Sequence, residues 1–344
     1  MTTRKPTAPI APERRRRPTS YDVARRAGVS QSAVSRCFAE GASIAPQTRE
    51  RVVKAAAELG YRPNALAQGL GSQRTGLIAV LVSALGALHY PEVLSEITRH
   101  LYARDMRVLL FPLYDESDVA EVLEQTLRHR VDGVIAAARL SEAHLAEFAA
   151  NHVPIVLYNR VSHTPSLSSV CCDSAVGERA LVELLLAAGH RRFAIIAGPA
   201  DSHITEVRRL TAERTLAEAG LEPVAVERGQ FTYQGGWDAM HAIAARGDRI
   251  DAVVCGNDML AIGALEAARA LGRRVPDDLS VVGFDGSEAA RWPSYGLTTF
   301  AQAIPRMTEA AVQMLVERID DPDLPPERRR FEGRLVVGTS ARLA

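Results

Sequence analysis

From Gly76 onward the chain alternates short apolar runs with amphipathic stretches of helical length. Apolar runs separated in this way are typical of parallel strands whose sheet is covered by helices on both faces. The pattern therefore predicts an α/β fold for most of the chain. The runs that predict strands are 77–83, 106–113, 133–138, 154–159, 193–198, 252–257 and 279–286.

The alternation falls into two series. The first closes near 160–172, and the second begins directly after it. Two such series predict two similar lobes with a cleft between them, and we expect crossover strands to return near Gln302 and near 336–339. Because ligands of such folds bind at the carboxyl ends of the strands, the cleft is the expected small-molecule site.

The net charge of zero conceals a strong asymmetry. Residues 1–75 carry 14 Lys and Arg against 5 Asp and Glu, whereas the remainder carries 27 against 36. A basic end joined to an acidic body indicates a nucleic-acid-binding segment. A solvated basic tail is the alternative, and Arg14 to Arg17 alone could form one, but basic residues also continue through the periodic segments that follow.

Residues 18–63 have the signals of three short helices. Thr19 followed by Asp22 resembles a capping box, with Asp in place of the usual Glu, and Gly28 can adopt the positive φ of a tight turn. A second helix over 31–38 follows that turn. The third begins at Pro46, ends at Gly60 and is expected to bury Val52, Val53, Ala56 and Leu59.

The second helix has two different faces. Helical periodicity places Ala33, Val34, Cys37 and Phe38 on one side, and Gln31, Ser32, Ser35 and Arg36 on the other. Two helices joined by a tight turn form a helix-turn-helix, whose second helix presents polar side chains to base edges. Spacing alone would fit a three-helix cap with a polar face equally well, and the basic charge favours DNA.

Several segments resemble the lactose/galactose-repressor family of transcription regulators. The headpiece segments are YDVARRAGVS, AVSR, TRERV and LGYRPNALAQ. The segments of the larger domain are GLIAVLVS, PIVLYNR, AAGHRRFAIIAGP, LTTFAQ and, most typical of all, CGNDMLAIGALEAARALGRRVPDDLSVVGFDG. The resemblance extends from residue 18 to about residue 340. It implies a DNA-binding headpiece and an effector-binding core similar to periplasmic sugar-binding proteins.

The resemblance assigns DNA contacts to individual positions. Gln31, Ser32 and Arg36 would enter the major groove. Residues 64–71 would form a hinge helix, whose Leu70 would wedge between base pairs in the minor groove. The alternative for Leu70 is a linker residue that packs on the larger domain. The expected contacts to the phosphate backbone are Thr19, Tyr21, Thr48 and Asn64.

The resemblance also assigns an effector cleft. Asp285 could accept two ligand hydroxyls, Arg208 could donate to hydroxyls or a carboxylate, and Asn257 could do both. Other roles stay open, because Asp285 could cap a segment and Arg208 could pair with glutamates. Thr211 stands where the family usually has Gly, so either Arg208 or Arg209 could face the cleft. The remaining expected contacts are Ser83, Asn159 and Phe231, and Phe231 could equally belong to the core.

The sequence shows no catalytic or metal-binding signature. It has no GxGxxG after a strand, no GxxxxGK[ST] and no GxSxG elbow, and its histidines form no HExxH. The four cysteines form no CxxC pair and are expected to be reduced, apolar residues. We therefore expect no enzyme activity, no metal and no cofactor. A sugar- or nucleotide-modifying α/β enzyme would need such a signature, which makes it the weaker alternative.

The expected protein is a regulator, in particular a repressor, whose operator affinity is controlled by a sugar, sugar acid or nucleoside bound between two lobes. We expect a homodimer on a near-palindromic operator, in the cytoplasm with the nucleoid and away from the membrane. A solute-binding protein for a transporter would instead need an export signal. The expected domains are a disordered basic arm (1–17), a helix-turn-helix domain (18–63), a hinge helix or linker (64–75) and an effector-binding core (76–344), whose N-lobe is about 76–171 and 302–331 and whose C-lobe is about 172–301 and 332–344.

Overall fold

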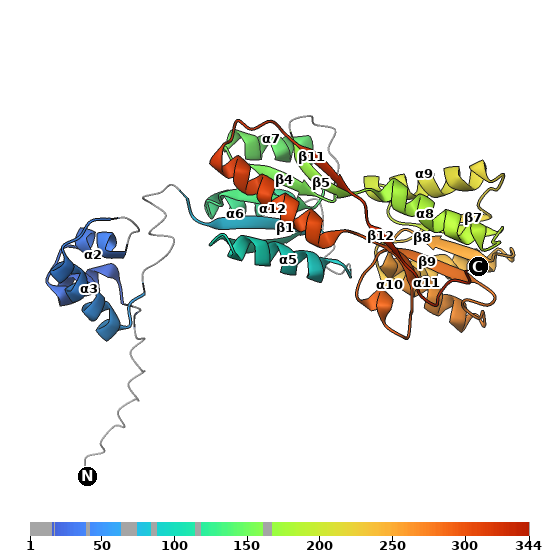
Figure 1. Cartoon of the computed structure of the whole chain (residues 1–344), viewed down its shortest axis with the longest axis horizontal. Helices are drawn as coiled ribbons and strands as arrows, with labels where there is room; N and C mark the ends of the chain where they lie inside the picture. The colour runs from blue at the N-terminus through green and yellow to red at the C-terminus, as the bar shows by residue number, and fades with distance from the viewer. Residues whose placement is uncertain are drawn as a thin grey trace, which may run out of the picture. The chain divides into compact units, whose positions relative to one another are not determined.

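The computed structural model describes residues 16, 18–38, 42–62, 74–83, 88–113, 118–160 and 167–343. The chain divides into two compact units, residues 1–75 and 76–344 (Figure 1). The expected basic arm, apart from Arg16, lies outside the described residues, and so does most of the expected hinge segment, including Asn64 and Leu70.

The first unit contains three helices, α1 (Ser20–Ala27), α2 (Gln31–Phe38) and α3 (Pro46–Leu59). At the start of α1 the backbone N–H and the hydroxyl of Thr19 both donate to Asp22 Oδ2, at 2.9 and 2.8 Å. Gly28 ends α1 at a φ of 64°, and Gly60 ends α3 at a φ of 65°. Local capping chemistry therefore fixes where these helices begin and end.

A small apolar core joins the three helices. Its buried members are Val23, Ala24, Ala27, Val34, Cys37, Val52, Ala55 and Ala56. The expectation for the third helix was partly wrong, because Val53 is 48% exposed and Leu59 36% exposed. Val53 points about 100° away from the buried face around Val52, and Leu59 is the last residue of its helix.

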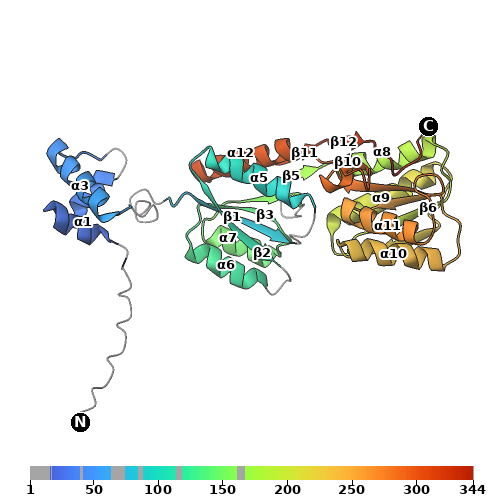
Figure 2. The same ribbon diagram turned by 90° about the horizontal axis from the view of Figure 1, so that it is seen from below.

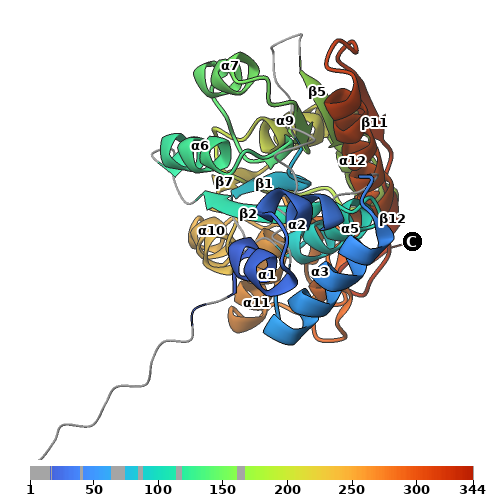
Figure 3. The same ribbon diagram turned by 90° about the vertical axis from the view of Figure 1, so that its left-hand side faces the viewer.

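The second unit is built on two six-stranded sheets. The strands of the first have the order β11-β5-β4-β3-β1-β2 and all pair in parallel. Alternate residues of β1 enter different cores: Ile78, Val80 and Val82 lie with α5 and α12, whereas Ala79 and Leu81 lie with α6 and α7 (Figure 3). The elements of this first lobe are β1 (Leu77–Ser83), α5 (Tyr90–Tyr102), β2 (Arg107–Leu113), α6 (Asp118–Arg128), β3 (Gly133–Ala137), α7 (Glu142–Ala150), β4 (Ile155–Tyr158), β5 (Ser168–Cys172), α12 (Ile304–Asp320) and β11 (Arg328–Phe331).

The second sheet has the order β12-β10-β9-β8-β6-β7, in which β12 alone runs antiparallel to its neighbour. Helices α8 and α9 cover one face, and α10 and α11 cover the other (Figure 2). The elements of this second lobe are α8 (Ser174–Ala187), β6 (Phe193–Ala197), α9 (His203–Glu218), β7 (Ala225–Arg228), α10 (Tyr233–Ala245), β8 (Ala252–Cys255), α11 (Asp258–Ala270), β9 (Ser280–Asp285), the 3₁₀ turn η1 (Ala289–Arg291), β10 (Thr298–Ala301) and β12 (Arg334–Val336).

The chain crosses between the lobes three times, after β5, after β10 and between β11 and β12. A helical headpiece and a two-lobed core of sheets flanked by helices confirm the predicted fold class. The crossovers bring the carboxyl ends of both sheets to face a common space, where loops and helix starts from each lobe meet.

Helices α10 and α11 are in unusually close contact, and this contact sets the position of the start of α11. A Cβ added at Gly263 would lie 2.1 Å from the carbonyl oxygen of Tyr233, and one added at Gly236 would lie 2.1 Å from that of Leu260. Neither backbone can move away without separating the helices. These two glycines therefore permit the observed helix spacing.

We predict that Gly263→Ala destabilises the core by about 1–3 kcal/mol, because overpacking at a helix–helix contact forces backbone shifts. Urea unfolding followed by circular dichroism measures the loss. The control is Gln234→Ala on the exposed face of α10, which should change stability by less than about 0.5 kcal/mol. Equal effects of the two changes would contradict the close-packing argument.

Candidate functional site

The polar face of helix α2 is directed towards solvent, because the opposite face of the helix packs into the core. Ser32 and Arg36 are exposed and Gln31 is half-buried, whereas Val34 and Cys37 on the opposite face belong to the core. Gln31 donates a 3.3 Å hydrogen bond to Ser20 Oγ of α1. Arg36 makes no ion pair with any described residue, so its guanidinium is available to a ligand outside this unit.

The other expected DNA contacts are spread over the same unit. Thr19 caps α1 and is half-buried, Tyr21 is 69% exposed, and Thr48 is half-buried in the first turn of α3. Thr19, Tyr21 and Gln31 thus lie in or directly before the first two helices, and Thr48 lies in the third. Asn64 and Leu70 lie outside the described residues.

A cavity that is partly open to solvent lies between the two lobes of the core. Concave spaces between lobes or domains are common positions of small-molecule sites. All six residues expected in the effector cleft lie along this one cavity. Its lining residues are Ser83, His89, Tyr90, Asn159, Arg160, Ser202, Ile204, Thr205, Arg208, Phe231, Asn257 and Asp285.

Four of these side chains are placed by the ends of strands. Ser83 ends β1, Asn159 directly follows β4, Asp285 ends β9 and Asn257 lies two residues beyond β8. Parallel strands deliver their carboxyl ends to one edge of each sheet, so residues distant in the sequence meet there. The cleft is thus a direct result of the sheet topology.

Of the two adjacent arginines on α9, Arg208 is the one that faces the cavity. Its Nη1 donates to the carbonyl oxygen of Gly256 at 2.6 Å and its Nη2 to Asp285 Oδ1 at 3.3 Å. Its guanidinium lies 3.5 Å from the centre of the Phe284 ring, a geometry that favours a cation. Arg209 points away and pairs with Glu206 and Glu213, so the two neighbours have separate roles.

Asp285 is the centre of the contacts in the cleft. Its Oδ1 accepts from Arg208 and, at 2.7 Å, from Gln302 Nε2, and its Oδ2 lies 3.2 Å from His89 Nδ1. Burial raises the pKa of this carboxyl, but the charges of His89 and Arg208 outweigh it and hold the pKa below its usual value. Asp285 is therefore an ionised carboxylate that is ready to accept hydrogen bonds.

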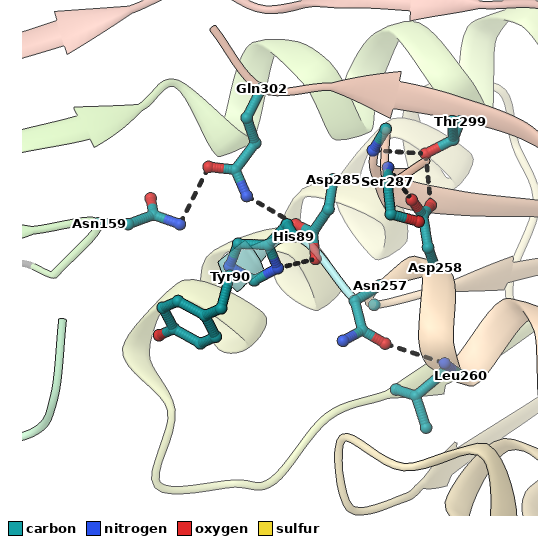
Figure 4. Close-up of polar contacts among 12 residues, drawn as sticks. His89, Tyr90, Asn159, Asn257, Asp258, Leu260, Asp285, Ser287, Thr299 and Gln302 are labelled. Carbon is teal, nitrogen blue, oxygen red and sulfur yellow. Dashed lines mark hydrogen bonds and ion pairs between the residues drawn. The ribbon is translucent and has the colours of Figure 1, made fainter. Parts of the chain in front are cut away.

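These contacts connect the two lobes. Asn159, from the first lobe, donates to Gln302 Oε1 at 3.1 Å, and Gln302 in turn donates to Asp285 of the second lobe (Figure 4). His89, at the start of α5, reaches Asp285 from the same side as Asn159. At the exposed rim Arg139 forms a 2.9 Å ion pair with Asp201, which follows β6.

Two of the other expected contacts, Asn257 and Phe231, have clear local roles. Asn257 caps α11, where its Oδ1 accepts from the Leu260 backbone N–H at 2.9 Å. Its amide nitrogen is left for the cavity. Phe231 lies so close to Gly198 that a Cβ there would come within 2.5 Å of its ring. Phe231 is thus both a half-buried packing residue and an apolar wall of the cavity.

Sequence reasoning missed several lining residues, chiefly His89, Tyr90 and Arg160. His89 and Tyr90 are stacked at 4.5 Å, and the Tyr90 hydroxyl donates to the carbonyl oxygen of Ala137 at 3.0 Å. The signal available in the sequence was position alone: each of these residues follows shortly after an apolar run that was assigned to a strand.

Two further buried carboxyls lie close to the cleft. Burial raises the pKa of Asp258 to about 7 even though the Thr299 hydroxyl and the Ser287 N–H both donate to it. Burial likewise raises the pKa of Glu178 to about 7, against the opposing effect of Arg208. Glu178 Oε2 is buried and has no hydrogen-bond partner among the described residues.

The described part of the chain contains neither a group of metal ligands nor a helix that could cross a membrane. Among those residues, no three His, Cys, Asp or Glu side chains are grouped so that they could hold a metal ion. No described helix combines the length and the apolar character that a membrane crossing requires. The four cysteines are free and buried.

A helix-turn-helix unit together with a two-lobed, ligand-cavity core defines a transcription regulator. The family model of bacterial regulatory proteins of the lacI family matches residues 19–64, and that of the periplasmic binding protein-like domain matches residues 182–341. The chain is 34% identical to the HTH-type transcriptional regulator CelR of Thermobifida fusca, over 95% of this chain and 99% of that protein. The chain belongs to the lacI family of bacterial regulatory proteins, as the sequence predicted.

A further relative and two solved structures are similar to this chain over almost their whole length. The ribose operon repressor of Escherichia coli K12 is 30% identical over 94% of this chain and 99% of its own. The lac repressor dimer bound to operator and the anti-inducer ONPF is 28% identical, with a TM-score of 0.84 over 96% of this chain and 100% of that one. A CelR–cellobiose complex is 31% identical, with a TM-score of 0.73 over 94% and 100%.

We predict that core stability falls as pH rises because of Glu178. The unfolded chain releases this proton near its ordinary pKa of 4.5, whereas the folded chain holds it until about 7, so the cost of folding grows across that window. Glu178→Gln should therefore lose less stability than the wild type between about pH 5 and pH 8, by roughly 1–3 kcal/mol.

Urea unfolding at a series of pH values measures this difference. The matched control is Glu183→Gln, which changes an exposed carboxyl on the same helix and should leave the pH dependence of the wild type unaltered. Parallel stability profiles for wild type and Glu178→Gln would show that this carboxyl does not titrate as described.

Proposed function

We propose that this protein is a transcriptional repressor whose affinity for operator DNA is controlled by a small sugar or sugar derivative bound between the lobes of its core. The observation that carries the effector site is the meeting of Arg208, Asn257 and Asp285 with Ser83, Asn159 and Phe231 along one cavity. A charged pair, neutral amides and an aromatic wall are what a polyhydroxylated ring requires. The relatives support this proposal, since one structure is named as a complex with cellobiose.

The headpiece is the proposed DNA-binding element. Gln31, Ser32 and Arg36 would donate to base edges in the major groove, where Arg pairs well with guanine. Thr19, Tyr21 and Thr48 would contact the phosphate backbone, which positions the helix without selecting a sequence. Asn64 and Leu70 are proposed as additional contacts, the second as a minor-groove wedge.

The contacts on Asp285 suggest how a ligand would act on the core. Gln302 and His89 occupy both carboxylate oxygens, so a ligand hydroxyl that binds there must replace or rearrange a contact between the lobes. Each such exchange favours one lobe arrangement over another. A coupling of about 1–3 kcal/mol between effector and operator binding is typical of such systems.

We further propose that the protein acts as a homodimer on a near-palindromic operator in the cytoplasm, since a two-fold dimer contacts two half-sites. The lac repressor relative is named as a dimer bound to operator. A transport-associated solute-binding protein would share the core but would have no use for the basic headpiece. No catalytic step is required of any residue in this mechanism.

We predict that Arg36→Ala weakens specific operator binding by about 10- to 100-fold, because a bidentate arginine–guanine contact contributes roughly 1–3 kcal/mol. Gel-shift titrations on fragments selected from the source genome measure this. Ligand-induced thermal stabilisation of the core should be unchanged. Arg128→Ala, which removes an exposed arginine of α6, is the control, and an equal loss in both variants would argue against a recognition role for Arg36.

We predict that Asp285→Asn abolishes the response to effector while operator binding without effector persists. The amide keeps the shape of the side chain but loses the charge that holds Arg208 and accepts ligand hydroxyls. Thermal-shift screens with sugars, sugar acids and nucleosides, followed by gel shifts with each hit, provide the test. Asp277→Asn, at an exposed carboxyl, is the control, and an unchanged effector affinity in Asp285→Asn would remove this residue from the site.

A further inference from the structure

The charges of the cleft are not balanced. Its described lining residues include two arginines, Arg160 and Arg208, and one histidine, but a single carboxylate, Asp285. A neutral ligand would leave this excess of positive charge in place. The distribution of that excess within the cavity indicates which part of a ligand it would meet.

The positive charge of Arg208 is already compensated by neighbouring groups of the protein. Its Nη2 lies 3.3 Å from Asp285 Oδ1, its Nη1 donates to the Gly256 carbonyl at 2.6 Å, and its Nε donates to Ser174 Oγ at 3.4 Å. The Arg208 side chain is 4% exposed, and its guanidinium also covers the Phe284 ring. All three of its nitrogens have partners, so Arg208 does not require an anionic ligand.

Arg160 differs in that it has no anionic partner among the described residues. Its Nη1 donates to the Asn159 carbonyl at 3.0 Å, its Nη2 makes a long contact of 3.4 Å with Ser83 Oγ, and its guanidinium also hydrogen-bonds to the Tyr90 hydroxyl. A guanidinium carries five N–H donors arranged to hold a carboxylate or phosphate bidentately, and these neutral contacts use only part of that set.

We propose that the effector carries an oxyanion and that Arg160 binds it, so that the ligand is a sugar acid or a sugar phosphate rather than a neutral sugar. This rests on the proposed function of the cleft. The carboxylate and the phosphate share the chemistry that matters here, a negatively charged group with several acceptor oxygens at one end of a polyol.

The position of Asp285 fixes the orientation of such a ligand. An oxyanion placed beside this ionised carboxylate would be repelled, and the neighbouring Arg208 is already neutralised by it. The anionic group therefore lies against Arg160 and Ser83 of the first lobe. The hydroxyls lie towards Asp285 and Asn257 of the second lobe, so a single ligand contacts both lobes.

The test uses full-length protein and titration calorimetry with matched probes. The neutral members are D-glucose, D-galactose and D-ribose. The carboxylate arm contains glucuronate, gluconate, galacturonate and galactonate, and the phosphate arm contains glucose 6-phosphate, galactose 6-phosphate and ribose 5-phosphate. The variants are Arg160→Gln, Arg160→Lys and the control Arg128→Gln, which removes one charge from the outer surface of the same lobe.

We expect at least one oxyanion probe to bind the wild type about 10-fold or more tightly than its neutral parent. Arg160→Gln should weaken that probe by about 10- to 100-fold, the worth of charge-assisted hydrogen bonds, and leave the neutral parent within about 3-fold. Arg160→Lys should be intermediate, and Arg128→Gln should match the wild type. The better arm identifies carboxylate or phosphate.

A neutral sugar that binds as tightly as its acid overturns the proposal, and so does an equal loss for both ligands in Arg160→Gln. If that variant does not fold, wild-type titrations at two salt concentrations decide instead, because only an oxyanion should bind more weakly at high salt. If no oxyanion probe binds while operator DNA is retained, the proposal fails and the repressor function stands. If operator DNA is not bound, the proposed function itself fails.

Discussion

The buried ion pair between Arg208 and Asp285 is the interaction on which the organisation of the cleft depends. Arg208 comes from α9 and Asp285 from the end of β9, and their 3.3 Å contact lies where burial removes most of the screening by water. An unpaired charge at this depth would be costly. The pair therefore stabilises the second lobe's side of the cavity in the absence of ligand. It also fixes the position of the carboxylate that His89 and Gln302 contact.

The sequence was sufficient to predict the parts of the structure that depend on local chemistry. Caps and glycines placed the three headpiece helices, and continuous apolar runs located the central strands of both sheets. The short edge strand β11, Arg-Arg-Arg-Phe, gave no such signal. Its polar residues become a strand only because β5 offers a free edge to pair with, and that edge exists only after the lobe has folded.

Prediction of the site from the sequence was limited in the same way. All six cleft residues taken from the family resemblance lie on the cavity, but the resemblance could not decide between Arg208 and Arg209, which are adjacent on one helix. The choice is made by tertiary partners: Glu206 and Glu213 hold Arg209 on the outer face, while Gly256 and Asp285 hold Arg208 inside. His89 was missed because its partner Asp285 lies far away in the chain, and Arg160 because only the folded lobe brings it to Ser83 and the cavity.

Two of the cleft residues are held in a backbone conformation that most amino acids avoid. Asn159 has a φ of 49° and Asp285 a φ of 118°, and Asn and Asp are among the few residues other than Gly that occur at positive φ with any frequency. When a duplicated gene evolves to bind a new metabolite, few other side chains would therefore be tolerated at these two positions. Ser83 and Arg160 of the first lobe and Phe231 and Asn257 of the second have no such constraint, so related regulators would acquire new inducers or corepressors chiefly by exchanging residues at positions of this second kind.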